Sequence, residues 1–283
     1  MSPWALVLVL VAAVTHASWN VLSKQAARAD GIVFVWLVAL ASTVVWGPLF
    51  AGFLLVTGTR PDLTDLGLIA VSAAIHLGYF VLLQKGYGKG DLSVVYPVAR
   101  GTGPMLASLV AVLVLDEHPG PAGVAGIVLV GVGVFMMSGG GRGDLRGLAF
   151  GLVVGVLIAG YTIWDSQVVS AFAVAPLMLV YAGEAGRALM LLPVVLGRRE
   201  LILPTWREHR WPVLGAAVLS FLSYLLVLFA FTMAPVSVVA PAREVSVLVA
   251  VLLGGRLLSE GHLPRRLIAA SVILGGIVAI ALS

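Results

Sequence analysis

Residues 93–97 read Ser-Val-Val-Tyr-Pro, and residues 237–241 read Ser-Val-Val-Ala-Pro, 144 positions later. Four other short matches keep the same order at nearly the same spacing. They pair Trp19-Asn20 with Trp164-Asp165, Leu77-Gly78-Tyr79 with Leu222-Ser223-Tyr224, Arg100 with Arg243, and Glu117 with Glu260. A repeat of fixed period decides the architecture of a chain. The sequence therefore predicts two similar halves.

A glycine-rich connection lies between the two matched parts. Residues 139–144 read Gly-Gly-Gly-Arg-Gly-Asp, a composition typical of a flexible linker. We predict one half over residues 1–138 and the other over residues 145–283.

The composition excludes an ordinary water-soluble protein. Of the 283 residues, 60% are hydrophobic and 11% are charged, whereas a soluble domain carries about 25% charged residues. Lipid must therefore surround most of the surface. The net charge of +4 reflects basic loops beside a bilayer, and no basic stripe with interleaved aromatic residues indicates a nucleic-acid partner. The absence of cysteine excludes disulfides, thiolate metal sites and cysteine nucleophiles, and we expect no cofactor or metal.

The hydrophobic stretches predict an all-α polytopic membrane protein. A spanning helix needs roughly 20 mostly apolar residues. The first apolar run resembles a signal peptide but lacks a basic start and continues past residues 17–18, so we interpret it as a retained span. Ten candidate spans lie near residues 4–24, 32–55, 64–86, 91–115, 121–138, 145–165, 173–196, 211–232, 237–257 and 265–282. The longest connection, residues 197–210, is predicted to be a loop on the membrane surface.

Five spans in each half predict that the halves enter the membrane in opposite orientations. Such an inverted repeat is a recurrent design of transporters, with the substrate site between the halves near the bilayer midplane. Channels and membrane enzymes also contain duplications, so these alternatives stay open at this point. If the N-terminus were cytoplasmic, the cytoplasmic loops would hold only Arg60, and the opposite loops would hold the other basic loop residues. The charge bias therefore places both termini outside.

Polar residues inside spans are candidates for a site, because burying them in lipid is unfavourable. His16 and Asn20 recur four residues apart on one helix face, with Trp19 beside them. Tyr161 and Asp165 occupy the matching face of the repeat, with Trp164 beside them. The alternative is that these residues lie at helix ends and bond to neighbours or headgroups, which is the preferred interpretation for Asp165.

Two arginines in the repeat favour an anion site. Tyr96 and Arg100 share one helix face next to a proline, and Arg243 and Glu244 also follow a proline. Arg243 and Glu244 are neighbours and point about 100° apart, so each is expected to pair elsewhere. Alternatively, the arginines reach the membrane interface with their long side chains.

One further acidic residue lies in a span. Glu184 and Arg187 are three residues apart, which favours an ion pair within one helix. The alternative is that Glu184 exchanges a proton during transport, and His16 is the second candidate for proton coupling.

Three stretches carry a resemblance to a known family. Residues 16–20 (His-Ala-Ser-Trp-Asn), 90–101 and 240–247 resemble bacterial EamA-type members of the drug/metabolite transporter superfamily. The resemblance implies a ten-helix protein of the cytoplasmic (inner) membrane that moves amino acids, other metabolites or drugs, often outward. It also implies a cavity lined by the first, third, fourth, sixth, eighth and ninth helices. Members of this family are usually described with both termini in the cytoplasm, contrary to the charge bias here.

The sequence is therefore interpreted as a secondary transporter, an exporter, of a small polar or anionic metabolite by alternating access. A flippase for a phosphate-linked lipid carrier is the alternative. No metalloprotease motif, paired aspartates or serine nucleophile motif is present, so an enzyme is not expected. One chain contains both halves, so a monomer suffices. The candidate substrate-binding residues are His16, Trp19, Asn20, Tyr79, Tyr96, Arg100, Tyr161, Trp164, Tyr224, Arg243 and Glu244.

Overall fold

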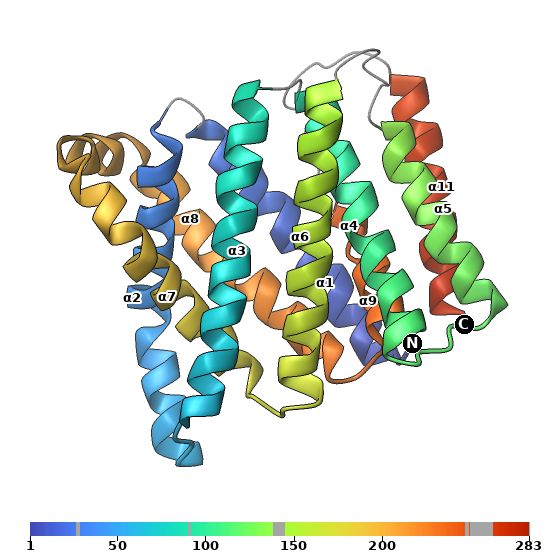
Figure 1. Ribbon diagram of the computed structural model, residues 1–283, viewed down its shortest axis with the longest axis horizontal. Coiled ribbons are helices and arrows are strands. Elements are labelled where there is room, and N and C mark those ends of the chain that lie inside the picture. The colour runs from blue at the N-terminus through green and yellow to red at the C-terminus, as the bar shows by residue number, and fades with distance from the viewer. Residues whose placement is uncertain (27–28, 90–91, 138–144, 247–248, 250–262, 283) are drawn as a thin grey trace.

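The described part of the chain is helical. The computed structural model describes residues 1–282 except 27–28, 90–91, 138–144, 247–248 and 250–262. The helices are α1 (Pro3–Gln25), α2 (Gly31–Thr57), α3 (Leu63–Lys89), α4 (Leu92–Val114), α5 (Pro121–Met137), α6 (Leu145–Ser170), α7 (Pro176–Leu196), α8 (Arg199–Phe231), α9 (Val236–Ala242) and α11 (Leu263–Ala281). In Figure 1, α1 begins and α11 ends at the same, lower edge of the molecule.

Most of the predicted spans coincide with helices to within a few residues. Within the described ranges, six helices are long and apolar enough to cross a membrane: α1, α2, α3, α6, α7 and α8. Shorter apolar stretches in α4, α5 and α11 cover Val98–Val114, Pro121–Met136 and Ser271–Ile280. Most of the predicted span 237–257 lies outside the described residues. The helical membrane architecture is thus present, and the full set of ten spans stays a prediction.

Local chemistry sets the ends of α2. The Asp30 carboxylate accepts hydrogen bonds from the amides of Ile32 (3.0 Å) and Val33 (3.1 Å), which otherwise have no partner at a helix start. At the other end, Gly58 has φ +66° and donates its amide to the carbonyl of Leu54. This left-handed conformation is available to glycine at little cost.

The prediction of a loop over residues 197–210 is wrong. Residues 199–208 are helical and join the membrane-spanning part of α8 across a kink, where His209 has non-helical angles. Pro212 explains the kink, because its ring cannot donate to the carbonyl four residues back and clashes with it. Ile202 and Trp206 pack against the buried cluster formed by the start of α2 and by Val213. Because this segment contains many charged residues, its apolar helix face was not recognised in the sequence.

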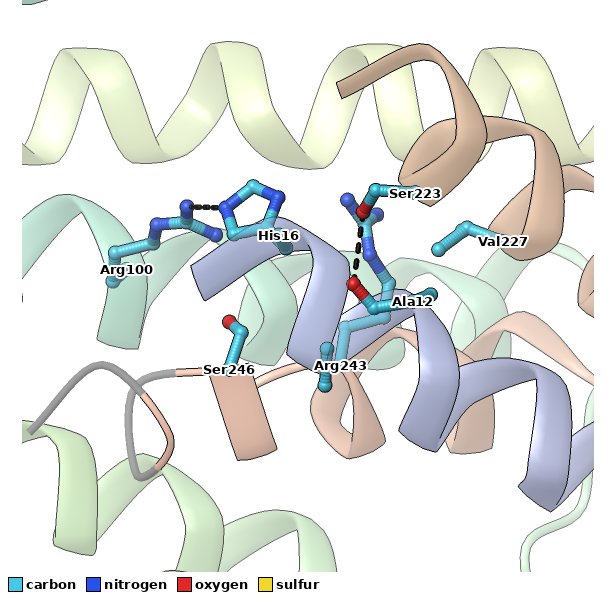
Figure 2. A pocket seen from close by; sticks show the side chains of 8 residues that line it. Ala12, His16, Arg100, Ser223, Val227, Arg243 and Ser246 are labelled. Atoms are coloured by element: carbon cyan, nitrogen blue, oxygen red, sulfur yellow. Dashed lines mark hydrogen bonds between the residues drawn. The ribbon is translucent and has the colours of Figure 1, made fainter. Parts of the chain in front are cut away.

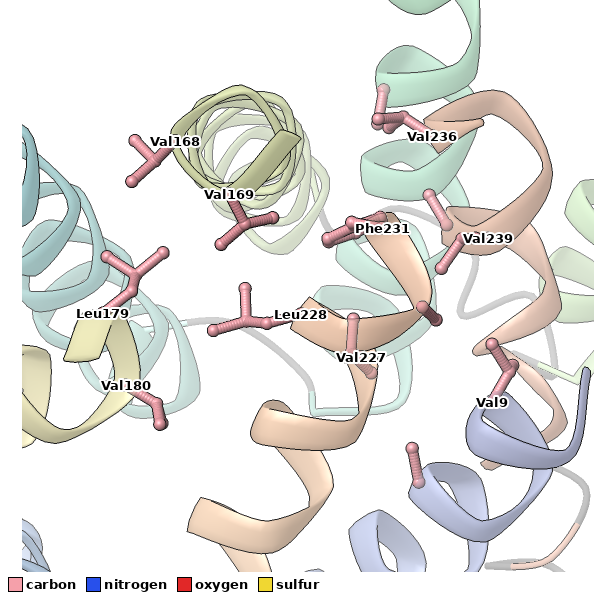
Figure 3. Close-up of a cluster of buried hydrophobic side chains, with 14 of the residues drawn as sticks. Val9, Val168, Val169, Leu179, Val180, Val227, Leu228, Phe231, Val236 and Val239 are labelled. Carbon is pink, nitrogen blue, oxygen red and sulfur yellow. The ribbon is translucent and has the colours of Figure 1, made fainter. Parts of the chain in front are cut away.

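A hydrophobic core joins the helices around α8. Figure 3 shows side chains from α1, α6, α7, α8 and α9 that converge in this cluster, with Phe231 and Leu228 near its centre. At one side of the molecule, α5 and α11 pack through glycines: a Cβ at Gly126 would lie 2.5 Å from the carbonyl oxygen of Gly276. The core thus holds α1 against α8, and α6 against α4 and α3.

A carboxylate from the first half of the chain caps a helix of the second half. Glu117, between α4 and α5, accepts the amides of Val236 (2.9 Å) and Ser237 (2.8 Å) at the start of α9. A negative charge suits this position, because it satisfies free amides and opposes the positive end of the helix dipole. This contact fixes α9 and, with it, the residues that follow α9 in the site.

Candidate functional site

A polar cavity lies between helices of the two halves. The cavity is small, with a volume of about 10 Å³, and is lined from both halves by Ala12, Ala13, His16, Arg100, Ser223, Val227, Arg243 and Ser246. The first four residues come from α1 and α4, and the others come from α8 and from the end of α9 onward. The cavity has room for little more than a water molecule. The site is therefore too small for a metabolite in this structure.

Arg100 connects the two halves inside the cavity. Its Nη1 lies 3.5 Å from Oε1 of Glu244, and the two side chains are 11% and 3% exposed. Its Nη2 contacts Nε2 of His16, as Figure 2 shows. Arg100 projects from α4 next to Gly101 and close to Gly103, whose missing side chains allow Phe135 and Ile158 to approach the helix. The predicted burial of this arginine is thus accommodated by an ion pair.

His16 faces a hydrogen-bond donor at each ring nitrogen. The indole N–H of Trp19 donates to Nδ1 at 3.2 Å, and an indole nitrogen can only donate. A neutral imidazole then carries its one proton on Nε2, which faces Arg100. A guanidinium has no acceptor, so two N–H groups point at the same place. An anionic acceptor at this place would receive hydrogen bonds from both.

Arg243 brings the second positive charge. It lies at the C-terminal cap of α9, just beyond Pro241, and its guanidinium carbon is 5.8 Å from the centre of the Tyr224 ring. Glu244, the next residue, pairs with Arg100, as the prediction of a partner elsewhere requires for this residue, whereas no ion pair of Arg243 is found among the described residues. Two guanidinium groups and one carboxylate leave the cavity with one net positive charge.

A second polar cluster lies next to the cavity and includes Tyr224, whose ring lies beneath the guanidinium of the lining residue Arg243. The hydroxyl of Tyr224 donates to Oδ2 of Asp165, which is 0% exposed. His76 from α3 stacks on Tyr161 at 4.1 Å between ring centres, and its Nδ1 lies 3.9 Å from Asp165. Tyr79 meets Tyr161 edge to face. Of the two outcomes expected for Asp165, bonding to neighbours or to headgroups, the structure shows the first, because the carboxyl is buried between α3 and α8.

The remaining predicted residues lie at various distances from the cavity. Asn20 donates to the carbonyl of His16 in its own helix, and the Trp164 indole donates to the carbonyl of Leu68. Neither lines the cavity. The side chain of Tyr96 is outside the described residues. The expected ion pair of Glu184 is present, with Arg187 at 3.3 Å.

Two lining serines were not singled out from the sequence. Ser223 donates its hydroxyl to the carbonyl of Ala12 at 2.9 Å and so fastens α8 to α1. Ser246 lies in the turn after Glu244. A serine in an apolar helix is weak evidence for a binding site, so neither residue was predicted, although Ser223 lies within one of the repeated stretches.

Comparison with known proteins agrees with this architecture. Residues 3–139 match the EamA-like transporter family, which confirms the resemblance predicted from the motifs over the first half. No curated protein matches the chain. A solved structure titled "Crystal structure of protein" matches 100% of this chain and 98% of its own, with a TM-score of 0.79 and 15% identity. That likeness shows the fold alone.

The helices define the class first: six described helices are long and apolar enough to cross a membrane, as in an integral membrane protein. The match then specifies the family, because residues 3–139 form an EamA-like unit of the drug/metabolite transporter superfamily.

Proposed function

We propose that this protein is a secondary transporter that exports a small anionic metabolite across the cytoplasmic membrane by alternating access. Arg100, Arg243 and the Nε2–H of His16 bind the anionic group of the substrate. The observation that carries the proposal is the convergence of these donors on one small cavity. A guanidinium matches carboxylate and phosphate geometry with paired hydrogen bonds.

The charge balance of the cavity supports an anion. Arg100 and Arg243 contribute two positive charges, and Glu244 offsets one of them. A charge buried without a partner costs several kcal/mol, so a bound anionic group would neutralise the site. A neutral or cationic substrate would leave the positive charge in place.

The helix contacts support an inverted repeat of two five-helix halves, residues 1–138 and 145–283. If each helix of the first half corresponds to one of the second, α1 corresponds to α6 and α3 to α8. The α1–α8 contact then maps onto the α3–α6 contact, and both are present. The contacts α2–α7, α4–α9 and α5–α11 map onto themselves. A pseudo-twofold axis would produce this pattern.

The small volume of the cavity also fits alternating access. The space is too small for a metabolite, so the helices that line it must separate before a substrate enters. The Arg100–Glu244 ion pair crosses between the halves and holds them together in this state. A substrate anion that competes with Glu244 for Arg100 would loosen this connection. Anion binding is thereby linked to the movement of the halves.

A thermal-shift screen of the purified protein tests the proposal. Ligand binding stabilises the folded state by RT ln(1 + [L]/Kd), about 2.7 kcal/mol at a concentration of 100 Kd. We expect methylphosphonate, methanesulfonate or acidic amino acids to raise the melting temperature, and neutral analogues of equal size to leave it unchanged.

Two variants locate the binding. Arg243→Gln should abolish the shift, whereas Arg60→Gln, which removes the same charge from an exposed position, should retain it. A full shift in Arg243→Gln would reject the arginine site. A response to phosphate-linked lipids alone would favour the flippase.

A further inference from the structure

Asp165 is the buried acid without an arginine in contact. Among the described residues, the one basic side chain within 4.0 Å of it is His76, whereas Glu184 and Glu244 each have an arginine at 3.3 and 3.5 Å. Its Oδ2 accepts the Tyr224 hydroxyl, and the Ser72 hydroxyl is another polar group close to the carboxyl, while Oδ1 has no partner with hydrogen-bond geometry in the described part of the chain. An ionised carboxylate in this position would be very costly.

His76 does not supply the missing positive charge. Its Nδ1 lies 3.1 Å from the carbonyl oxygen of Ser72. A carbonyl can only accept, so Nδ1 donates its proton there. The distance of 3.9 Å from Nδ1 to Asp165 is too long for a hydrogen bond. The side chain is only 14% exposed, and a charge removed from water is costly, so a neutral imidazole fits these surroundings.

We propose that the carboxyl group of Asp165 is the proton-binding site of this transporter, and that it binds its proton together with an anion at Arg243. The site carries the proton in this state of the protein. Arg243 links the two events, because its guanidinium lies over the ring of Tyr224, whose hydroxyl holds Asp165. The anion part of this proposal rests on the proposed function.

The charged groups around Asp165 determine the sign of the coupling. His76 faces it from α3, Tyr224 from α8, Arg187 from α7 and Arg243 from the end of α9. Ser72 on α3 is also near the carboxyl, and α4 meets α6 through small groups such as Thr102 and Gly103.

Of Arg187 and Arg243, only Arg243 can change its electrostatic effect on Asp165 when an anion binds. Arg187 is already paired with Glu184, so its positive charge is largely offset. Arg243 has no acidic side chain within 4.0 Å among the described residues, so its charge favours ionised Asp165. An anion that neutralises Arg243 therefore removes support for the carboxylate, and the proton binds more tightly. By linkage, the proton also raises the affinity for the anion.

This assignment differs from both proton-coupling candidates of the sequence. Glu184 has an ion-pair partner, Arg187, one turn along its own helix. His16 contacts Trp19 through Nδ1 and Arg100 through Nε2, and it is assigned to the anion site instead. Asp165 alone among these combines full burial, an unpartnered oxygen and a structural link to the anion site.

Infrared spectroscopy of the purified, ligand-free protein tests the proton site without any substrate. A protonated carboxyl has a C=O stretching band that a carboxylate lacks. We expect this band near neutral pH, its loss in Asp165→Asn and its retention in the control Glu184→Gln. Tyr224→Phe should shift the band without removing it, because it deletes one hydrogen bond and keeps the acid. A band unchanged in both Asp165→Asn and Tyr224→Phe would overturn the assignment.

The affinity for methanesulfonate at pH 6 and pH 8 tests the coupling, since this probe keeps the same charge at both values. One linked proton changes the affinity by at most about tenfold per pH unit. We expect weaker binding at pH 8 for the natural protein and equal binding at both values for Asp165→Asn. A pH dependence that persists in Asp165→Asn, or no dependence in the natural protein, would overturn the coupling. If methanesulfonate binds at neither pH, the anion site fails, and the infrared band still decides the role of Asp165.

Discussion

The ion pair between Arg100 and Glu244 should contribute more to stability than a shorter pair at the surface. Two unit charges 3.5 Å apart interact by about 5 kcal/mol at an effective dielectric constant of about 20. Removing one partner leaves the other buried without compensation, at a cost of about 3–5 kcal/mol. Arg100→Gln and Glu244→Gln should each destabilise the protein by this amount.

A double-mutant cycle isolates the interaction itself. Unfolding of the two single variants and of Arg100→Gln/Glu244→Gln is followed in detergent micelles. We expect the double variant to be more stable than the sum of the single effects predicts, with a coupling energy of about 2–3 kcal/mol. The control pair is Arg198 and Asp30, which is shorter at 2.7 Å but is 40% and 24% exposed.

The control pair shows whether burial or the distance between the charges determines the coupling energy. Exposed ion pairs contribute about 0–1 kcal/mol, because water and salt screen them. Asp30→Asn keeps the Oδ1 acceptor that caps α2, so the cycle with Arg198→Gln reports the ion pair alone. If the two cycles gave equal coupling, or if the Arg100 and Glu244 variants were additive, the argument that burial strengthens the cavity pair would be refuted.

Two other substitutions test the packing. Gly276→Ala would place a Cβ 2.7 Å from the Gly126 carbonyl oxygen and should destabilise the protein by about 1–3 kcal/mol, while Gly275→Ala, with nothing within 4 Å, should melt at or above the original temperature. Glu117→Ala removes the cap of α9 and should cost about 0.5–2 kcal/mol, against a negligible effect of Glu208→Ala at a side chain that is 74% exposed. Equal melting of the two glycine variants, or of the two glutamate variants, would contradict these expectations.

Helix positions could be predicted well because lipid imposes a simple rule. Long apolar stretches bounded by charges or by proline and glycine must be helical, since no water is available for the backbone. The rule failed at residues 199–208, where the apolar face is formed by only a few residues such as Ile202 and Trp206. A short interfacial helix has little total hydrophobicity, so its periodicity is easily missed.

The site was partly predictable because the repeat marks equivalent positions. Arg100 and Arg243 match in sequence, and both line the cavity. The full burial of Asp165 was not predicted, because distance from a helix end does not measure burial. The indole of Trp164, one position earlier, is directed to the carbonyl of Leu68, whereas Asp165 faces Tyr224. Which side of a helix is enclosed depends on neighbours that are distant in the sequence.

The repeat distributes the two proposed sites differently between the halves. Each half supplies one arginine to the anion site, so an anion would meet similar groups from either half. The position that matches Asp165 in the first half is Asn20, whose amide bonds to its own helix and cannot release a proton. His76 likewise has Phe221 as its counterpart. On this proposal the proton site has no acidic counterpart at the matching position, and a cycle that uses Asp165 alone would move one proton with each anion. If both halves bound a proton, the first half would need an acid at the position that matches Asp165, but this position is Asn20.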